Sequence, residues 1–221
     1  LNLANTESTF DKLALVSGGA IDATFNDVSV MPGKIALING TNTITLNLKA
    51  AAVAGTETLN IELAGATGAA AVTVTDDGAG KIEAATINSI SAANQLATLA
   101  LNGASSLTIT GDKGLTLDAA LEATVATVDA SAMTGATGLT LAANPGFATG
   151  ITITGGAGAD SLRGTTAGKD NISGGAGNDT ITFAGDGSQF AATDTVDGGD
   201  GADTVAVDNT AIVSSMLGGL T

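Results

Sequence analysis

The chain has 221 residues, 44% of them hydrophobic, and its 22 Asp and Glu against 7 Lys and Arg give a formal net charge of −15 at pH 7. This acidic balance argues against nucleic acid and anionic membranes as partners, and no apolar run is long enough to predict a membrane span. Cysteine and histidine are absent, which excludes disulfides and removes the commonest general base and transition-metal ligand.

Residues 1–95 form a β-rich N-terminal part, with short strand-like runs separated by glycine, proline and asparagine turn signals. The clearest run, Thr43-Ile44-Thr45-Leu46-Asn47-Leu48, alternates strictly between polar and apolar residues, which indicates a half-buried strand. Two interpretations remain open for this part, namely early solenoid coils or a small β-sandwich. The other predicted strands lie at residues 13–16, 24–30, 34–38, 57–63 and 71–75.

An acidic turn follows the last of these runs at Asp76 and Asp77. It is a candidate second cation site, but an ordinary solvated turn is the favoured interpretation.

Residues 96–154 have shorter and more regular runs, which predict a parallel β-solenoid. Pairs of apolar residues recur every eight to fourteen residues, with Gly, Ser, Asp or Asn between most of them. This is the pattern of stacked coils with variable loops, and it continues into residue 155 without a linker. The pairs are Leu99/Leu101, Leu107/Ile109, Leu115/Leu117, Val125/Val128, Leu139/Leu141 and Ile151/Ile153.

Residues 155–206 contain five units related to the nine-residue pattern G-G-x-G-x-D-x-U-x, in which U is a large apolar residue. Three units follow the pattern without exception, and the other two are altered. An aspartate recurs at the sixth position, and an apolar residue follows two places later in every unit. The aspartates are Asp160, Asp170, Asp179, Asp194 and Asp203, and the apolar residues are Leu162, Ile172, Ile181, Val196 and Val205.

Each unit reads as one tight turn and one short strand, so two units complete a coil and turns on the same side are two units apart. This pairs Asp160 with Asp179, Asp179 with Asp203, and Asp170 with Asp194. Carboxylates stacked about 4.8 Å apart repel one another unless a cation lies between them. Carboxylate and backbone carbonyl oxygens are the ligands of calcium, so several calcium ions are predicted here.

The five units resemble the calcium-binding β-roll of the RTX (repeats-in-toxin) family, over residues 155–206. The resemblance implies calcium between turns two units apart, held by the aspartates and by carbonyls of the first residues of each turn. The second unit departs from the pattern at Thr165 and Thr166, and Gln189 replaces the fourth aspartate if that unit is read without its insertion. The implied metal residues are Gly155, Ala157, Asp160, Asp170, Gly174, Gly175, Ala176, Gly177, Asp179, Asp194, Gly199, Gly201 and Asp203.

Segments outside the roll, such as Val128-Asp129-Ala130-Ser131, resemble those of RTX-bearing bacterial surface-layer and adhesin-like proteins. This second resemblance implies type I secretion and a place on the bacterial cell surface (S-layer). It also implies self-assembly into a homo-oligomeric lattice. Cell-surface polysaccharide is a further candidate partner, through parts outside this sequence.

Three functions compete: a calcium-dependent structural segment of a surface coat, a segment of a secreted adhesin, and the RTX portion of a secreted enzyme. The motifs H-E-x-x-H and G-x-S-x-G are both absent, so catalysis in this segment is not expected. The two halves of the chain are not copies of each other, which favours the coat over an adhesin array.

The predicted fold is therefore all-β, a right-handed parallel β-solenoid or β-helix that runs into a calcium-binding RTX β-roll. Its segments are residues 1–95, the solenoid at 96–154, the roll at 155–206, and a terminal strand or turn at 207–221. We expect the chain to be a piece of a longer protein.

Overall fold

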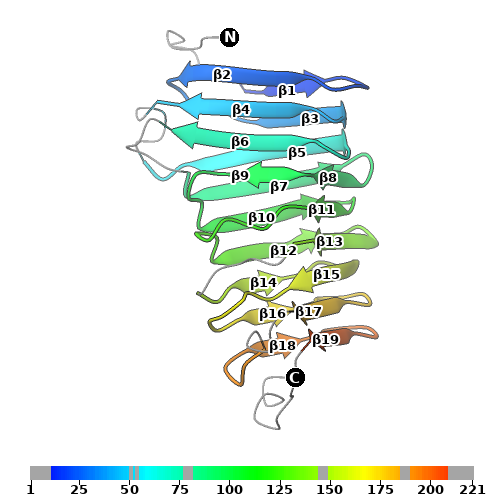
Figure 1. Cartoon of the computed structure of the whole chain (residues 1–221). Helices are drawn as coiled ribbons and strands as arrows, with labels where there is room; N and C mark the ends of the chain where they lie inside the picture. The colour runs from blue at the N-terminus through cyan, green and yellow to red at the C-terminus, as the bar shows by residue number, and fades with distance from the viewer. Residues whose placement is uncertain are drawn as a thin grey trace.

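The computed structural model describes residues 11–49, 52, 55–76, 82–143, 149–184 and 190–208. Its strands form three sheets in which every recorded strand pair is parallel, and the strands stack as successive coils (Figure 1). None of the described segments is a helix long and apolar enough to span a membrane. The prediction of an all-β parallel solenoid is confirmed.

The longest sheet has nine strands and runs the whole length of the stack. Its order is β1-β3-β5-β7-β10-β12-β14-β16-β18. The bounds are β1 Leu13–Val16, β3 Ile35–Gly40, β5 Thr58–Ala66, β7 Ala84–Ile90, β10 Ser106–Gly111, β12 Thr127–Met133, β14 Thr152–Thr154, β16 Asn171–Ser173 and β18 Thr195–Asp197.

The second wall of the solenoid is divided between two sheets. The four-stranded sheet has the order β2-β4-β6-β9, with β2 Asp22–Val28, β4 Thr43–Leu48, β6 Ala71–Asp76 and β9 Thr98–Ala100. The six-stranded sheet, β19-β17-β15-β13-β11-β8, consists of β8 Asn94–Leu96, β11 Leu115–Leu117, β13 Thr137–Leu141, β15 Ala159–Arg163, β17 Thr180–Ala184 and β19 Thr204–Asp208.

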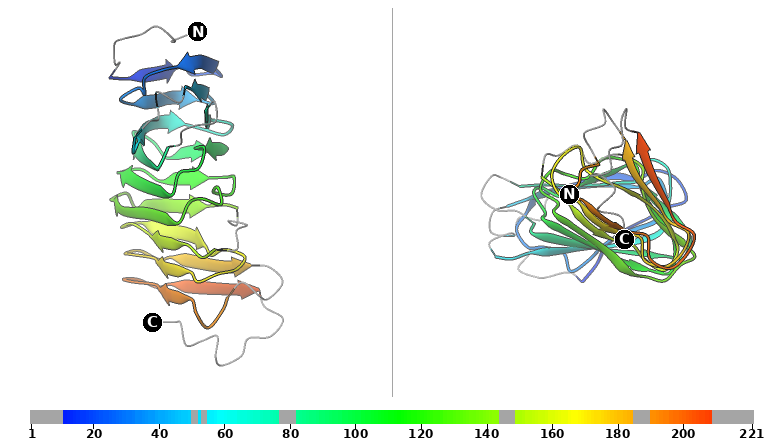
Figure 2. Two further views of the ribbon diagram at one scale, coloured as in Figure 1. Left: turned by 90° about the vertical axis from the view of Figure 1, so that its left-hand side faces the viewer. Right: turned by 90° about the horizontal axis from the view of Figure 1, so that it is seen from below.

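The core is a set of apolar columns that extend along the stack inside the coils, which lie over one another around one interior (Figure 2). In the nine-stranded sheet, register places one buried apolar side chain of each strand directly over that of the next. Since the same column crosses from the early coils into the RTX units, both parts share one core. One such column is Leu59, Ala85, Leu107, Val128, Ile153, Ile172 and Val196, all at most 1% exposed.

Strands before residue 95 pair in parallel within the same sheet as those after it, so they form coils of the same stack. Strands β1 and β4 have the predicted bounds, whereas β7 was not predicted. On its buried face the sequence AATINSI has Ala85, Ile87 and Ser89, so only one large apolar residue marks the strand and the apolar signal is weak. Residue 77, part of the predicted acidic turn, and most of 207–221 lie outside the described residues.

The second wall changes sheets between β7 and β10, where the chain contributes two strands instead of one. Strand β9 pairs with β6 and ends the four-stranded sheet, while β8 pairs with β11 and begins the six-stranded one. Asn94, the first residue of β8, is only 2% exposed. This change of sheet therefore places a polar side chain inside the coil.

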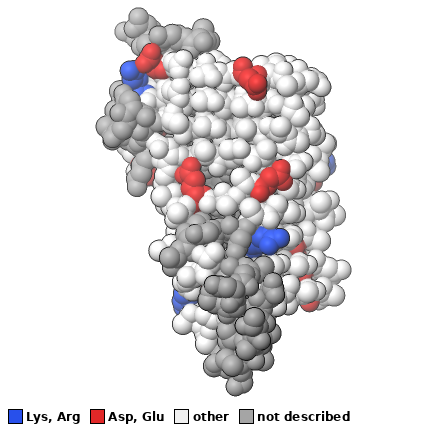
Figure 3. Space-filling model, viewed as in Figure 1, with Lys and Arg blue, Asp and Glu red and all other residues white. Residues whose placement is uncertain are grey.

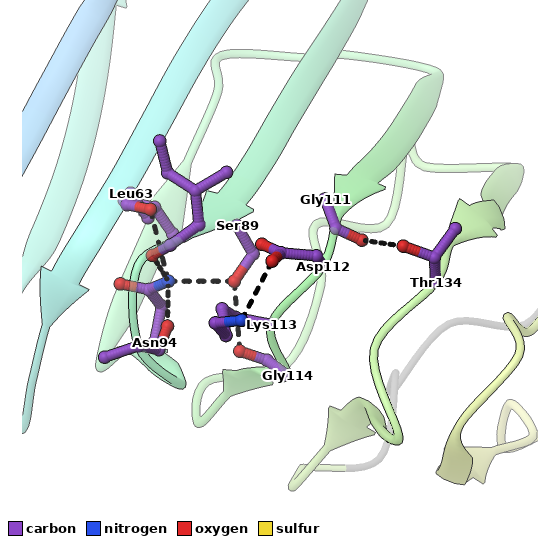
Figure 4. Close-up of polar contacts among 10 residues, drawn as sticks. Leu63, Ser89, Asn94, Gly111, Asp112, Lys113, Gly114 and Thr134 are labelled. Carbon is purple, nitrogen blue, oxygen red and sulfur yellow. Dashed lines mark hydrogen bonds and ion pairs between the residues drawn. The ribbon is translucent and has the colours of Figure 1, made fainter.

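The Asn94 amide group satisfies the backbone of this corner (Figure 4). Its Oδ1 accepts the N–H groups of Gly65 and Ala66, both at 2.8 Å. Its Nδ2 lies within donating distance of Ser89 Oγ at 2.9 Å and the Ala92 carbonyl at 2.8 Å. Because an amide both donates and accepts, one buried side chain serves both kinds of backbone group.

We expect Asn94→Ala to lower the free energy of unfolding by about 3 kcal/mol, because it leaves several buried backbone groups without partners. The neighbouring Gln95→Ala, which loses a part-buried bond to Asp118, should lower it by less than about 1 kcal/mol. Urea unfolding of both variants in calcium measures the difference. Equal losses would show that the Asn94 contacts do not hold this corner.

Candidate metal centre

The five aspartates of the repeats lie in two columns, one on each side of the roll. Asp179 and Asp203 end the turns that precede β17 and β19, and Asp160 is the second residue of β15. The register pairs Ser161 with Thr180 and Thr180 with Thr204, which stacks these three turns. Asp170 and Asp194 precede the paired residues Asn171 and Thr195 on the other side. The pairing predicted from the nine-residue period is therefore present.

Each aspartate side chain points into its turn, where it accepts a backbone N–H from the preceding coil. Asp179 Oδ1 lies 2.8 Å from the Asp160 nitrogen, and Asp203 Oδ1 lies 2.9 Å from the Asp179 nitrogen. Asp194 Oδ1 accepts the Asp170 N–H at 2.9 Å. The exposed fractions of Asp160, Asp170, Asp179 and Asp194 are at most 3%. In the repeats, an aspartate oxygen therefore takes the place of a backbone carbonyl as the acceptor for these N–H groups.

The first glycine of each intact repeat makes room for a carboxylate and a carbonyl together. A Cβ atom on Gly174 would clash with Asp179 Oδ2 and with the carbonyl oxygen of Gly198 in the next coil. A Cβ on Gly155 would likewise clash with Asp160 Oδ2 and the Gly174 carbonyl. Oxygens from adjacent coils thus converge beside these glycines, which explains why the pattern requires glycine there.

Asp179 Oδ2 is a buried oxygen without a hydrogen-bond partner. A buried carboxylate oxygen left without a partner is costly. The two nearby oxygen types, carboxylate and carbonyl, are those that calcium prefers. Among the described residues no three His, Cys, Asp or Glu side chains form a cluster, so carbonyl oxygens must complete the coordination. With carboxylate and backbone carbonyl oxygens as ligands, the residues of this column fit a calcium ion.

The electrostatics of the columns favour loss of negative charge. Burial raises the pKa of Asp160 to about 6, although the N–H groups of Leu139 and Gly156 act in the opposite direction and Asp179 adds repulsion. Burial also raises the pKa of Asp170 and of Asp179, each with a further contribution from the next aspartate of its column. Binding of a proton or a cation would lower the cost of burying these charges.

The structure decides which residue of the ten-residue second repeat, residues 164–173, takes the first glycine position. The Gly164 N–H donates to the Thr182 carbonyl at 3.1 Å, just as the Gly155 N–H donates to Ser173 at 2.8 Å. Thr165 N–H then donates to Asp170 Oδ2, as Gly156 N–H donates to Asp160 Oδ2, both at 2.8 Å. Gly164 therefore takes the first glycine position, which the alignment gave to Thr165, and the turn accommodates one inserted residue.

Several residues predicted to offer carbonyl ligands also take part in bonds between coils. The Gly175 carbonyl accepts the Asp200 N–H at 2.8 Å, and the Ala176 N–H donates to the Gly156 carbonyl at 2.9 Å. The Ala157 N–H donates to the Met133 carbonyl in the coil before the repeats, at 3.0 Å. Gly177, Gly199 and Gly201 lie in the same column of turns. Which of these carbonyls hold calcium stays a prediction.

Two glycines close to the carboxylates were missed by the sequence reasoning. Gly198 occupies the same repeat position as Gly155 and Gly174, so consistent use of the period would have included it. Gly164 could not be found in this way, because the inserted residue hides its position. Gln189, the alternative sixth residue of the fourth repeat, lies outside the described residues, and Asp194 fills that role in the column.

The family model for RTX calcium-binding nonapeptide repeats (4 copies) matches residues 152–181, 164–187 and 191–208. No curated protein and no solved structure matches the chain. The C-terminal coils are thus RTX repeats, which are calcium-binding motifs and are typical of secreted proteins.

We expect calcium removal to unfold the roll while sparing the earlier coils, because metal binding supplies part of its folding free energy. In a chelator, backbone amides of residues 155–206 should lose protection against hydrogen exchange. Part of residues 40–150, whose columns are apolar, should keep it. Exchange measured by mass spectrometry with and without calcium tests this. Unchanged protection in the repeats would contradict it.

The metal-free roll should become more stable as the pH falls from about 7 to about 5. The pKa of Asp160 is higher in the folded chain, about 6 against 3.8, so the folded state binds more protons in this range and gains stability. Calcium affinity should fall over the same range, because the ligands must be deprotonated. Thermal melting in chelator, with calcium titrations at each pH, measures both trends. Melting temperatures that rise with pH in chelator would contradict the assignment.

Proposed function

We propose that this chain is a calcium-dependent structural segment of a bacterial surface-layer protein, and that it assembles with copies of itself into a cell-surface coat. The segment is secreted in this proposal, performs no catalysis, and has other copies as its main partner. Cell-surface polysaccharide would be bound by other parts of the protein.

The observation that carries the proposal is the single sheet that joins the calcium repeats to the earlier coils. The nine-stranded sheet, which begins with β1 and ends with β18, is parallel and carries continuous apolar columns. An ordered roll therefore continues directly into the rest of the stack. A rigid rod with an ion-dependent end is suited to a structural role.

The outer face of the four-stranded sheet supports contacts between copies. Register aligns Thr24, Thr45 and Thr73 in one outward row, and in a second row Asn47 hydrogen-bonds Asn26 and Thr75. On the side of the molecule that Figure 3 shows, the visible charged side chains are few and scattered. A flat and mostly neutral sheet face can pack against another copy with little desolvation of charge.

The net charge of −15 opposes such packing when the chain is metal-free. Calcium would neutralise carboxylates of the roll and fix the shape of that end. Sodium at equal ionic strength screens the repulsion but lacks the coordination. The proposal therefore distinguishes specific binding from screening.

We expect the full-length protein to form sheets or large oligomers in calcium but not in sodium of equal ionic strength. Electron microscopy and light scattering measure this. Asp179→Asn should prevent assembly. Asp112→Asn removes the same charge from an exposed loop outside the repeats and serves as the matched control. A calcium-loaded protein that stays monomeric at high concentration would refute the coat, and binding of that monomer to polysaccharide would favour the adhesin.

A further inference from the structure

The three turns of the Asp160, Asp179 and Asp203 column do not share one conformation. In the second and third turns, the glycines at the second and fourth repeat positions have positive φ: Gly175 at 103° and Gly177 at 125°, then Gly199 at 88° and Gly201 at 143°. The corresponding glycines of the first turn, 156 and 158, are outside this region. The turns of residues 174–179 and 198–203 therefore form a matched pair, and the turn of residues 155–160 differs.

In the first turn, backbone N–H groups bond both carboxylate oxygens of Asp160. Asp160 Oδ2 accepts the Gly156 N–H at 2.8 Å, and Asp160 Oδ1 accepts the N–H of Leu139 in the preceding coil. The register between β13 and β15 shifts here, so that Gly138 and Leu139 lie opposite Asp160, and no aspartate of the repeats does. Asp160 thus ends the column, with both oxygens bonded.

The opposite side of the roll is also closed by protein groups. Asp170 Oδ1 accepts the Ile151 N–H at 2.9 Å and lies 2.9 Å from the Thr165 hydroxyl, while Oδ2 accepts the Thr165 N–H. Asp194 Oδ1 accepts the Asp170 N–H, and Oδ2 accepts the Ala191 N–H at 2.7 Å. All four oxygens of this column are therefore bonded to the protein.

Asp179 differs from Asp160, Asp170 and Asp194 because only one of its oxygens is bonded. The residue is 1% exposed, and its Oδ2 has no partner. This oxygen converges with the Gly198 carbonyl on the space beside Gly174. The unpartnered oxygen thus faces the matched turn of residues 198–203, where a cation would relieve it without breaking a hydrogen bond.

We infer that the first calcium ion is held between the turns 174–179 and 198–203, and that the Asp170 and Asp194 turns close without metal. Calcium at the other turns would have to compete with hydrogen bonds that already satisfy the carboxylates. Thr165, at the second glycine position of the longer repeat, supplies bonds to Asp170 in place of an ion. The inference rests on calcium binding alone and holds whether or not the protein forms a coat.

Calcium titration calorimetry on the chelator-treated chain tests the position of the first site. Asp179→Asn and Asp203→Asn should each weaken the tightest binding step by about tenfold or more, which is the loss of metal affinity expected when a group that supports a metal site is changed. Asp170→Asn and Asp194→Asn, which make the same charge change in the other column, should leave that step within about twofold. A loss on Asp170→Asn or Asp194→Asn as large as that on Asp179→Asn would overturn the assignment.

Thermal melting separates a metal site from a metal-free turn. Asp179→Asn should lower the melting temperature in calcium far more than in chelator. Thr165→Val, which removes the hydroxyl group near Asp170, should lower it equally in both. A calcium-dependent loss on Thr165→Val would show that this turn binds metal. A wild-type chain that binds no calcium would refute the site and the calcium role together, whereas calcium binding without assembly would refute the coat alone.

Discussion

The parallel stacking of successive coils is the constraint on which the rest of this structure depends. Hydrogen-bonded register places each strand residue over a residue of the next coil, so that in several columns of the described stack similar side chains meet. For the apolar positions this is favourable, as in the column from Leu59 to Val196. For aspartates the same register creates rows of buried negative charge. One geometric rule thus produces both the core and the need for a cation.

Buried polar groups at the corners of the coils show why charge changes the behaviour of the stack. Asn42 and Asn94 lie inside the early coils, and each amide both donates to and accepts from the backbone. These corners are complete without a ligand. An ionised aspartate can only accept, so its column is complete only where N–H groups suffice, and Asp179 is where they do not. We therefore expect the early coils and the roll to differ in their dependence on metal, although they share one sheet.

This difference suits a protein that must fold under one condition and remain open under another. We expect the coils with apolar columns to order without calcium, and the roll to order fully only when calcium binds the column of Asp179. Because the sheet is continuous, order in the roll extends a structure that already exists rather than creating a separate domain. In the proposed coat, the same ion would complete the fold and lower the charge that keeps copies apart.

The sequence by itself determined the nine-residue period, and hence the two aspartate columns, the pairing two units apart and the calcium chemistry. These follow from local spacing, because each unit carries its own turn and strand. Only the tertiary structure decided what depends on neighbouring coils. The inserted residue at Gly164, the change of sheet at Asn94 and the weakly apolar strand β7 each depend on backbone in another coil. The contrast between Asp179 and Asp170 also needed the folded turns. Through Oδ1 each accepts an N–H from the coil 19 residues before it, but only Asp170 has a partner for Oδ2, the Thr165 N–H of its own turn.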